Sequence, residues 1–511
     1  MKKEYRILYL LAVVKFVLPF LLQNSFYEPH RDEFLYLAEG HHLAWGYMEI
    51  PPLLSVFAWI TNLFGTSVFW LKFWPSLFGA LTYIITGKII LSLGGRWFAL
   101  VLAFLAFVFG VYLRAYFLFQ PNFLEIFFWT MIAFSLTRYI QTGKNYWLYI
   151  LGVSAGLGMI SKYSVAFFII SVLGGLLITR NRKIFLNKHL YFSAFIALLI
   201  CTPTFLWEYN NHFPVLVHMK ELHQFQLQYV KPSGFLTDQL LMNLPCVFVW
   251  IAGLYFGVCK EKGKYRIFAW AYLMVILLLL YFQGKNYYSL GVYPVLFAFG
   301  AVQLERFAAS HSVAWKYVFI TIPFALGIYL APLYLPLWKP EKLAAYYNAR
   351  HIEKTGFLKW EDMENHPLPQ DFADMLGWEE MAQKVSVVWS SLTEDEKKHT
   401  LLFCDNYGQA GALNFYARKY HLPEAYSDNA SFLYWLPSGK TTIENVLLVT
   451  DDQNEMQHDF IHDFATAEVS DSIVNPYARE EGSLIIILKG ANEKMKKMFH
   501  DKIQADKDKF R

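Results

Sequence analysis

The sequence predicts a multi-pass α-helical membrane protein that carries a smaller α/β domain at its C-terminal end. Two observations support this fold class. Hydrophobic residues make up 56% of the 511 residues and charged residues only 17%, whereas soluble domains contain about half and about a quarter, respectively. Apolar runs long enough to cross ~30 Å of hydrocarbon also recur up to residue 337 and not beyond it. This composition excludes a disordered chain, a collagen-like fibre and an ordinary soluble enzyme.

We therefore divide the chain into a membrane module, residues 1–337, and a soluble α/β domain, residues 338–511. Eleven membrane spans are expected in the module, near residues 7–23, 68–92, 96–113, 121–140, 146–160, 163–179, 189–207, 236–258, 266–282, 288–305 and 315–336. Helices 33–45 and 52–64 are expected to lie at the membrane interface. In the soluble domain we expect strands at 400–405, 446–450 and 484–488, and helices at 408–420 and 492–510.

Basic residues predict how the module is oriented. Lysine and arginine are dense in alternate links, for example at 180–188 and 260–266, and sparse in the links between them. The positive-inside rule then places the N-terminus in the cytoplasm and the soluble domain outside a cell (inner) membrane, in the periplasm. Lys2, Lys3 and Arg6 before an apolar run would also suit a signal peptide, but no A-x-A-like cleavage site follows, so we expect an uncleaved first span.

The first outer link holds the most informative acidic residues. Asp32 and Glu33 follow the first span and lead into an apolar stretch, and Glu49 lies two residues before Pro51-Pro52. Acids at a membrane surface are often merely solvated, and a pair at a helix start is also favoured by the helix dipole. The functional alternative is a general base with a helper residue at the outer face of the bilayer.

Other outer links add groups that suit a site opening outward. They are Asn122 and Glu125 at the start of the fourth span, Lys162, Lys285, Tyr287 and Tyr288 in or beside later links, and His212, His218 and His223 in the longest link. A lone outer lysine is more often a snorkelling anchor. As a set, however, Lys162 and Lys285 are candidates to hold a phosphate. Asn122, Glu125, Tyr287 and Tyr288 are candidate contacts to the substrate or acceptor.

Several short motifs occur in a distinctive order. They are Asp32-Glu33, Gly46-Tyr47 with Pro51-Pro52, Ser161-Lys162-Tyr163, Gly284-Lys285-Asn286-Tyr287-Tyr288, Asn406-Tyr407-Gly408-Gln409-Ala410-Gly411-Ala412, Leu422-Pro423 and Tyr434-Trp435. This set resembles glycosyltransferase family 39, the superfamily of dolichyl-phosphate-mannose–protein mannosyltransferases and bacterial aminoarabinose transferases.

The resemblance implies a GT-C fold and an enzyme that transfers a sugar, with inversion, from a polyprenyl-phosphate carrier to a lipid, glycan or protein acceptor at the outer face. It places the catalytic acid at Asp32, beside Glu33. It also implies a divalent metal ion held by Glu49 and a histidine of the long outer link, for which we favour His218 over His212 and His223.

This sequence departs from the family pattern in three places. Ile50 stands where the aminoarabinose branch has lysine, Leu35 where arginine is expected, and Asn122 where an aspartate is expected. These departures leave the sugar and the metal open, and Glu125, one turn after Asn122, is a candidate to compensate.

Two rival functions remain from the sequence alone. A transporter or lipid flippase would predict paired broken helices in two repeated halves and acids within the spans, and the sequence contains neither pattern. A membrane-anchored interaction protein would leave the polar groups of the outer links unexplained. The net charge of +4 does not suggest nucleic-acid binding, and the four cysteines form no zinc pattern.

The orientation can be tested with reporter fusions. An enzyme that is active only outside the cytoplasm should work when fused after Arg511 and fail when fused at Arg182, because the basic links stay inside. Activity of the Arg182 fusion would overturn both the orientation and the outward-facing site.

Overall fold

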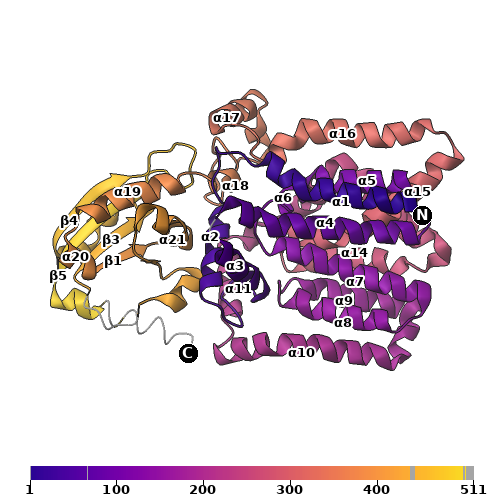
Figure 1. Cartoon of the computed structure of the whole chain (residues 1–511), viewed down its shortest axis with the longest axis horizontal. Coiled ribbons are helices and arrows are strands. Elements are labelled where there is room, and N and C mark those ends of the chain that lie inside the picture. The colour runs from indigo at the N-terminus through magenta and orange to yellow at the C-terminus, as the bar shows by residue number, and fades with distance from the viewer. Residues whose placement is uncertain (1, 66, 438–442, 499–500, 502–511) are drawn as a thin grey trace.

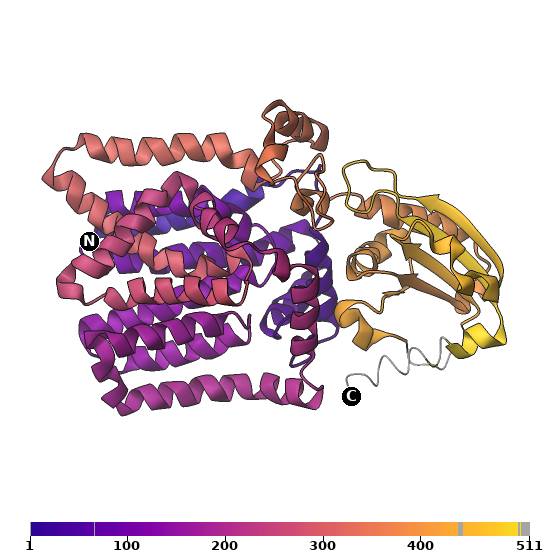
Figure 2. The ribbon, with the colours of Figure 1, turned by 180° about the vertical axis from the view of Figure 1, so that it is seen from behind.

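The computed structural model describes residues 2–65, 67–437, 443–498 and 501. Long helices run side by side in a bundle at one end of the molecule, and a sheet domain lies at the other end (Figure 1 and, from behind, Figure 2). The bundle helices are α1 (Lys2–Leu22), α4 (Val68–Ser92), α5 (Trp97–Val108), α7 (Asn122–Thr142), α8 (Tyr146–Met159), α9 (Val165–Ile178), α10 (Lys188–Asn210), α13 (Val247–Cys259), α14 (Arg266–Tyr281), α15 (Tyr293–Ser310) and α16 (Ala314–Tyr334).

Each predicted span overlaps one of these helices. The predicted span 236–258 is not a single helix, because it includes the end of α12 (Pro232–Leu241), which is bent by 66° from the segment Leu244–Cys259. Among the described residues, six helical segments are long and apolar enough to cross a membrane, or eight if each of two bent pairs forms one span; α5, α8 and α14 are apolar but shorter. The predicted span 96–113 is interrupted, because Gly110 adopts φ +107° between α5 and α6 (Val111–Ala115). The prediction of a multi-pass helical module is confirmed.

Short helices close the end of the bundle that faces the sheet domain, where Figure 1 shows α2, α3 and α11. They are α2 (Arg31–His41), α3 (Leu53–Phe64), α11 (Pro214–Phe225) and α12 (Pro232–Leu241). Helices α2 and α3 correspond to the two predicted interface helices. The chain after the bundle forms α17 (Pro340–Ala349) and α18 (Gln370–Ala373). They pack on the link between α1 and α2 and on α6 through an apolar cluster that includes Tyr27, Leu113 and Phe372.

The C-terminal domain contains a five-stranded sheet in the order β2-β1-β3-β5-β4. The elements are α19 (Trp378–Ser391), α20 (Glu394–Lys398), β1 (Thr400–Cys404), α21 (Tyr407–Tyr420), β2 (Ala425–Tyr426), β3 (Asn445–Thr450), β4 (Phe464–Ser472) and β5 (Leu484–Ala491). Strand β1 pairs in parallel with β2 and β3, whereas β5 is antiparallel to β3 and β4. The predicted α/β class is confirmed.

The sequence predicted β1, β3, β5 and α21 but missed β2 and β4. Strand β2 has only two residues, and β4 is largely exposed and polar, so neither contains an apolar run. Of the predicted closing helix 492–510, residues 493–498 are helical. Residues 499–500 and 502–510 lie outside the described part of the chain.

A buried ion pair fixes the start of α2 on the bundle. Glu33 and Lys72 of α4 are almost fully buried, and Lys72 Nζ lies 3.1 Å from Glu33 Oε1. The same carboxylate accepts hydrogen bonds from the backbone N–H groups of Phe119 at 2.7 Å and His30 at 2.8 Å. The hydrogen bond from the His30 N–H to Glu33 forms one half of a capping box at the start of α2. The other half comes from the His30 side chain, whose Nδ1 accepts the Asp32 N–H at 3.2 Å. Glu33 therefore ties together α2, α4 and the chain before α7.

Loss of this pair should destabilise the module. Lys72→Met leaves the Glu33 carboxylate buried without its cation, which typically costs about 3–5 kcal/mol. We expect a clearly lower melting temperature in detergent by tryptophan fluorescence, and partial recovery in Lys72→Met/Glu33→Gln. Lys88→Met is the matched control, because Lys88 lies on the same helix but is exposed. Equal melting temperatures for the two single variants would contradict this role.

Candidate active site

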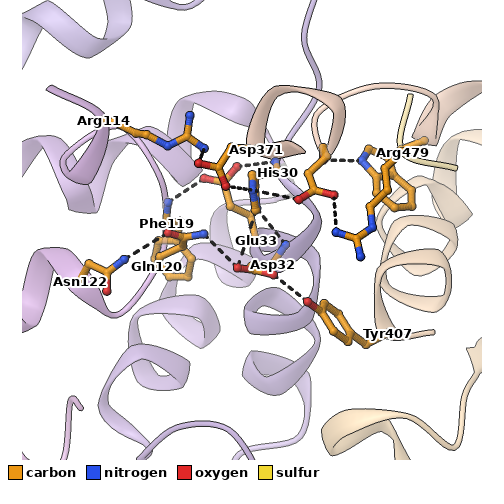
Figure 3. A network of polar contacts seen from close by, with 12 residues as sticks. His30, Asp32, Glu33, Arg114, Phe119, Gln120, Asn122, Asp371, Tyr407 and Arg479 are labelled. Carbon is orange, nitrogen blue, oxygen red and sulfur yellow. Dashed lines mark hydrogen bonds and ion pairs between the residues drawn. The ribbon is translucent and has the colours of Figure 1, made fainter. Parts of the chain in front are cut away.

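Asp32 lies at the start of α2, between the bundle and the sheet domain (Figure 3). Its Oδ1 accepts a hydrogen bond from the Tyr407 hydroxyl at 2.8 Å, and its Oδ2 accepts one from Gln120 Nε2 at 3.0 Å. The His30 Nδ1 atom lies 4.0 Å from Oδ2, and the Asp32 side chain remains 31% exposed. A carboxylate has about four acceptor positions, so Asp32 keeps the capacity to take a proton from a bound molecule.

Glu33, predicted as a helper, points away from this exposed position. Its two oxygens are engaged by Lys72 and by the two backbone N–H groups described above, and its side chain has 0% exposure. This geometry suits a residue that holds α2 in place. It does not suit one that contacts a substrate.

A series of polar contacts joins Asp32 to Lys162. The Asn122 Nδ2 atom donates to Gln120 Oε1 at 3.3 Å, and Lys162 Nζ donates to Asn122 Oδ1 at 2.6 Å. The same ammonium pairs with Glu125 Oε2 at 2.9 Å. Asp32, Lys162 and the first turn of α7, which holds Asn122 and Glu125, are far apart in the sequence but belong to one network at this end of the bundle.

Two tyrosines and a second lysine border this network. Lys162 Nζ lies 4.3 Å from the Tyr288 ring centroid and 5.4 Å from that of Tyr287. Burial and the nearby charge of Lys285 lower the pKa of Lys162, although Glu125 opposes this effect. Within the described part of the chain, the side chain of Lys285 forms no hydrogen bond or ion pair, whereas its backbone carbonyl accepts the Tyr288 N–H at 3.1 Å. The structure thus brings together all the candidate phosphate and substrate contacts, and Lys285 retains an unpaired cation.

The predicted metal pair, Glu49 and His218, gains no direct support. Both oxygens of Glu49 accept hydrogen bonds from Ser431, one from its N–H at 2.7 Å and one from its hydroxyl at 2.6 Å. Burial, followed by the charge of Lys285, lowers the pKa of His218 to about 4. A neutral imidazole can bind a metal. However, Glu49 is engaged by the sheet domain, and no contact between Glu49 and His218 occurs among the described residues, so the pair stays a prediction.

A different group of potential ligands lies beside Asp32. His30 Nε2 is 3.9 Å from Asp371 Oδ1 and 3.7 Å from Asp374 Oδ2. Because His30 Nδ1 accepts the Asp32 N–H, the proton of the neutral ring is on Nε2 and faces the carboxylates. Burial lowers the pKa of His30, but the three neighbouring aspartates outweigh burial and raise it. The arrangement fits a charge-assisted contact better than a metal site, which would need the Nε2 lone pair.

Two arginines complete this second cluster. Arg114 Nη2 lies 3.0 Å from Asp371 Oδ2, and Arg479 Nη1 lies 3.4 Å from Asp374 Oδ1. Figure 3 shows them on either side of His30, with Arg114 from the bundle and Arg479 from the sheet domain. These contacts attach α18 and the sheet domain to the start of α2.

Sequence reasoning missed several residues that shape the site. Lys72 lies within the predicted span 68–92. Because a charged residue within a span usually has a partner, its position alone indicated a buried ion pair. Arg114, Asp371 and Arg479 had no local motif. Tyr407 belongs to the motif 406–412 and Gln120 lies just before the fourth span, but nothing in the sequence indicated that both contact Asp32.

Comparison with known proteins gives a family match over part of the chain and a fold over most of it. Residues 49–207 match the family described as dolichyl-phosphate-mannose-protein mannosyltransferase. This segment includes Glu49, Asn122, Glu125 and Lys162 and begins after Asp32. No curated protein matches the chain.

The fold is shared with solved structures of ArnT from Cupriavidus metallidurans. The structure bound to undecaprenyl phosphate has a TM-score of 0.63 and 13% identity, over 94% of this chain and 97% of that chain. The apo structure has a TM-score of 0.58 and 12% identity, over 94% and 97% of the two chains. Together with the matching segment, these likenesses confirm the resemblance found in the sequence motifs: the chain is a multi-pass membrane protein with the GT-C fold, and its residues 49–207 are similar to the dolichyl-phosphate-mannose-protein mannosyltransferase family.

Proposed function

We propose that this protein is an integral-membrane glycosyltransferase that moves a sugar from a polyprenyl-phosphate carrier to a lipid, glycan or protein hydroxyl at the outer face of the membrane. Asp32 is the general base, and Lys285 and Lys162 hold the donor phosphate. The fold, the family segment and the undecaprenyl phosphate bound by the similar ArnT structure support a lipid-linked donor.

One observation carries the assignment of the base. Glu33 and Glu125 are each paired with a lysine, at 3.1 Å and 2.9 Å. Asp32 instead accepts hydrogen bonds from the neutral side chains of Tyr407 and Gln120 and is partly exposed. It is therefore the carboxylate of this network that is held in place without being neutralised by a lysine, as a general base requires.

The chemistry follows from these positions. As the acceptor oxygen attacks the anomeric carbon, its proton passes to the Asp32 carboxylate. The bond between the anomeric carbon and the phosphate oxygen breaks, and its electron pair leaves with the phosphate. Attack from the face opposite the phosphate inverts the anomeric centre. A cation near the departing oxygen stabilises the charge that develops there.

Asp32→Asn should fold and insert normally but lose about 10²-fold or more in kcat, because an amide keeps the shape and cannot accept the proton. The assay uses the lipid-linked sugar that a deletion strain is expected to accumulate, purified from that strain by its mass. A deletion strain with unchanged lipids and glycans would contradict the proposed function itself.

Glu39→Gln is the matched control for Asp32→Asn. Glu39 lies on the same helix, is buried, and accepts the Ser55 hydroxyl at 2.6 Å. Burial and the charge of Glu49 raise the pKa of Glu39 well above its usual range, so glutamine resembles its neutral form. Equal kcat for the two variants at equal protein levels would remove Asp32 from the mechanism.

Lys285→Met should weaken binding of undecaprenyl phosphate to the purified protein, with Kd rising about tenfold. One contact between a phosphate and a water-accessible cation is worth between about 1 and about 4 kcal/mol, and a tenfold change in Kd corresponds to about 1.4 kcal/mol. Lys162→Met should have a smaller effect of the same sign, because Glu125 already neutralises Lys162. Exposed Lys220 of α11 supplies the control, Lys220→Met. Wild-type Kd values in both test variants would show that these lysines are only interfacial anchors.

A further inference from the structure

We propose that Tyr407 of the C-terminal domain is a positioning residue for Asp32, so that the soluble domain supplies part of the active site. This inference rests on the proposed role of Asp32 as the general base. It assigns a function to a domain for which neither the family segment nor the sequence motifs indicate one.

The Asp32 carboxylate is held from two sides. Tyr407 donates to Oδ1 at 2.8 Å from the sheet domain, and Gln120 donates to Oδ2 at 3.0 Å from the chain that leads into α7. Figure 3 shows the two donors approaching Asp32 from opposite directions. With one donor on each oxygen, rotation of the carboxylate about its terminal bond would break both contacts. The two fixed donors therefore determine which lone pairs of the Asp32 carboxylate face the hydroxyl of the acceptor substrate.

The sequence around Tyr407 brings its hydroxyl to this position. Asn406 caps α21, because its Oδ1 accepts the N–H groups of Gly408 at 2.9 Å and Gln409 at 3.1 Å. Tyr407 is the first residue of α21. It thus projects from a fixed helix end and not from a loose loop.

Two glycines allow α21 to approach α2 closely. A Cβ atom at Gly411 would lie 2.8 Å from Cβ of Phe34, and one at Gly408 would lie 2.6 Å from Cγ of Arg31. The glycines are three residues apart and therefore lie on one face of α21. Larger residues at these positions would push α21 away from α2 and separate Tyr407 from Asp32.

The Tyr407 side chain is also fixed and remains a donor. The Arg31 guanidinium carbon lies 4.4 Å from the centroid of the Tyr407 ring, a cation–π distance. Burial and the negative charge of Asp32 raise the pKa of Tyr407 well above its usual range, although Arg31 opposes this. The hydroxyl therefore stays protonated at any physiological pH, and the contact has a fixed direction, from Tyr407 to Asp32.

A tether between the domains is the alternative role, and the same helix offers a control for it. The Tyr416 hydroxyl donates to Glu28 Oε2 at 3.3 Å, so it also links α21 to a carboxylate of the first outer link. Glu28 is not part of the network around Asp32. Tyr416→Phe thus removes a comparable hydroxyl contact without touching the proposed base.

The test compares Tyr407→Phe, Tyr416→Phe, Asp32→Asn and the double variant Tyr407→Phe/Asp32→Asn. We expect Tyr407→Phe to lower kcat about 10-fold to 100-fold, within the range that misplacing a catalytic group can cost, with the purified lipid-linked sugar as donor. Its KM and its Kd for undecaprenyl phosphate should stay near the wild-type values, since the lysines are untouched. Tyr416→Phe should keep kcat near the wild-type value. Adding Tyr407→Phe to Asp32→Asn should cause no further loss, because Tyr407 acts through Asp32.

Three outcomes would overturn the inference. The first is equal kcat for Tyr407→Phe and Tyr416→Phe while Asp32→Asn is inactive, which leaves the proposed function intact. The second is a full additional loss in the double variant. The third is wild-type activity of Asp32→Asn, which removes the proposed base as well. If Tyr407→Phe does not accumulate, Gly411→Val tests the same geometry, because it displaces α21 and keeps the hydroxyl; unchanged kcat in Gly411→Val would also contradict the inference.

Discussion

The buried pair of Glu33 and Lys72 is the interaction on which the arrangement of the site depends. It fixes the first turn of α2 against α4, and two backbone N–H groups complete the coordination of the carboxylate. Successive residues of a helix project about 100° apart. When Glu33 is anchored inward, its neighbour Asp32 must therefore project toward the boundary with the sheet domain. Two adjacent carboxylates thus have different environments, and the burial of Glu33 determines the direction in which Asp32 projects.

The same end of α2 is also where the C-terminal domain is attached. Phe34 packs against Trp378 and Phe415, with ring centroids 5.7 Å and 5.3 Å away, and His30 faces Asp371 and Asp374. Charged contacts and apolar contacts alternate along this short helix, so the interface is anchored at several points. The sheet domain consequently borders the candidate site on the side that faces away from the bundle. A site formed between two domains can exclude water more fully than one open at the membrane surface, and electrostatic contacts are stronger when water is excluded.

Much of the fold could be predicted from the sequence, because apolar runs of the length of a bilayer are a strong local signal. Asp32, Lys162 and Lys285 could also be singled out, since their motifs are local. The partners of these residues could not. Tyr407 is 375 residues from Asp32 and Lys72 is 39 residues from Glu33, and no local pattern specifies such pairings.

Strand β4 was missed for a different reason: an exposed edge strand needs backbone pairing but no apolar side chains. The break at Gly110 was missed because an apolar run does not reveal where its backbone changes direction.

The asparagine at position 122, where the family pattern has an aspartate, has a consequence for the polarity of the network. Lys162 donates to Asn122, Asn122 donates to Gln120, and Gln120 donates to Asp32. Both amides are therefore aligned head to tail, with a cation at one end of the row and an anion at the other. Aligned hydrogen bonds polarise one another in a low-dielectric setting. A carboxylate at position 122 could accept from Lys162 but could not donate to Gln120, and the row would end there. In this chain, the amide of Asn122 therefore keeps the row of hydrogen bonds unbroken from Lys162 to Asp32.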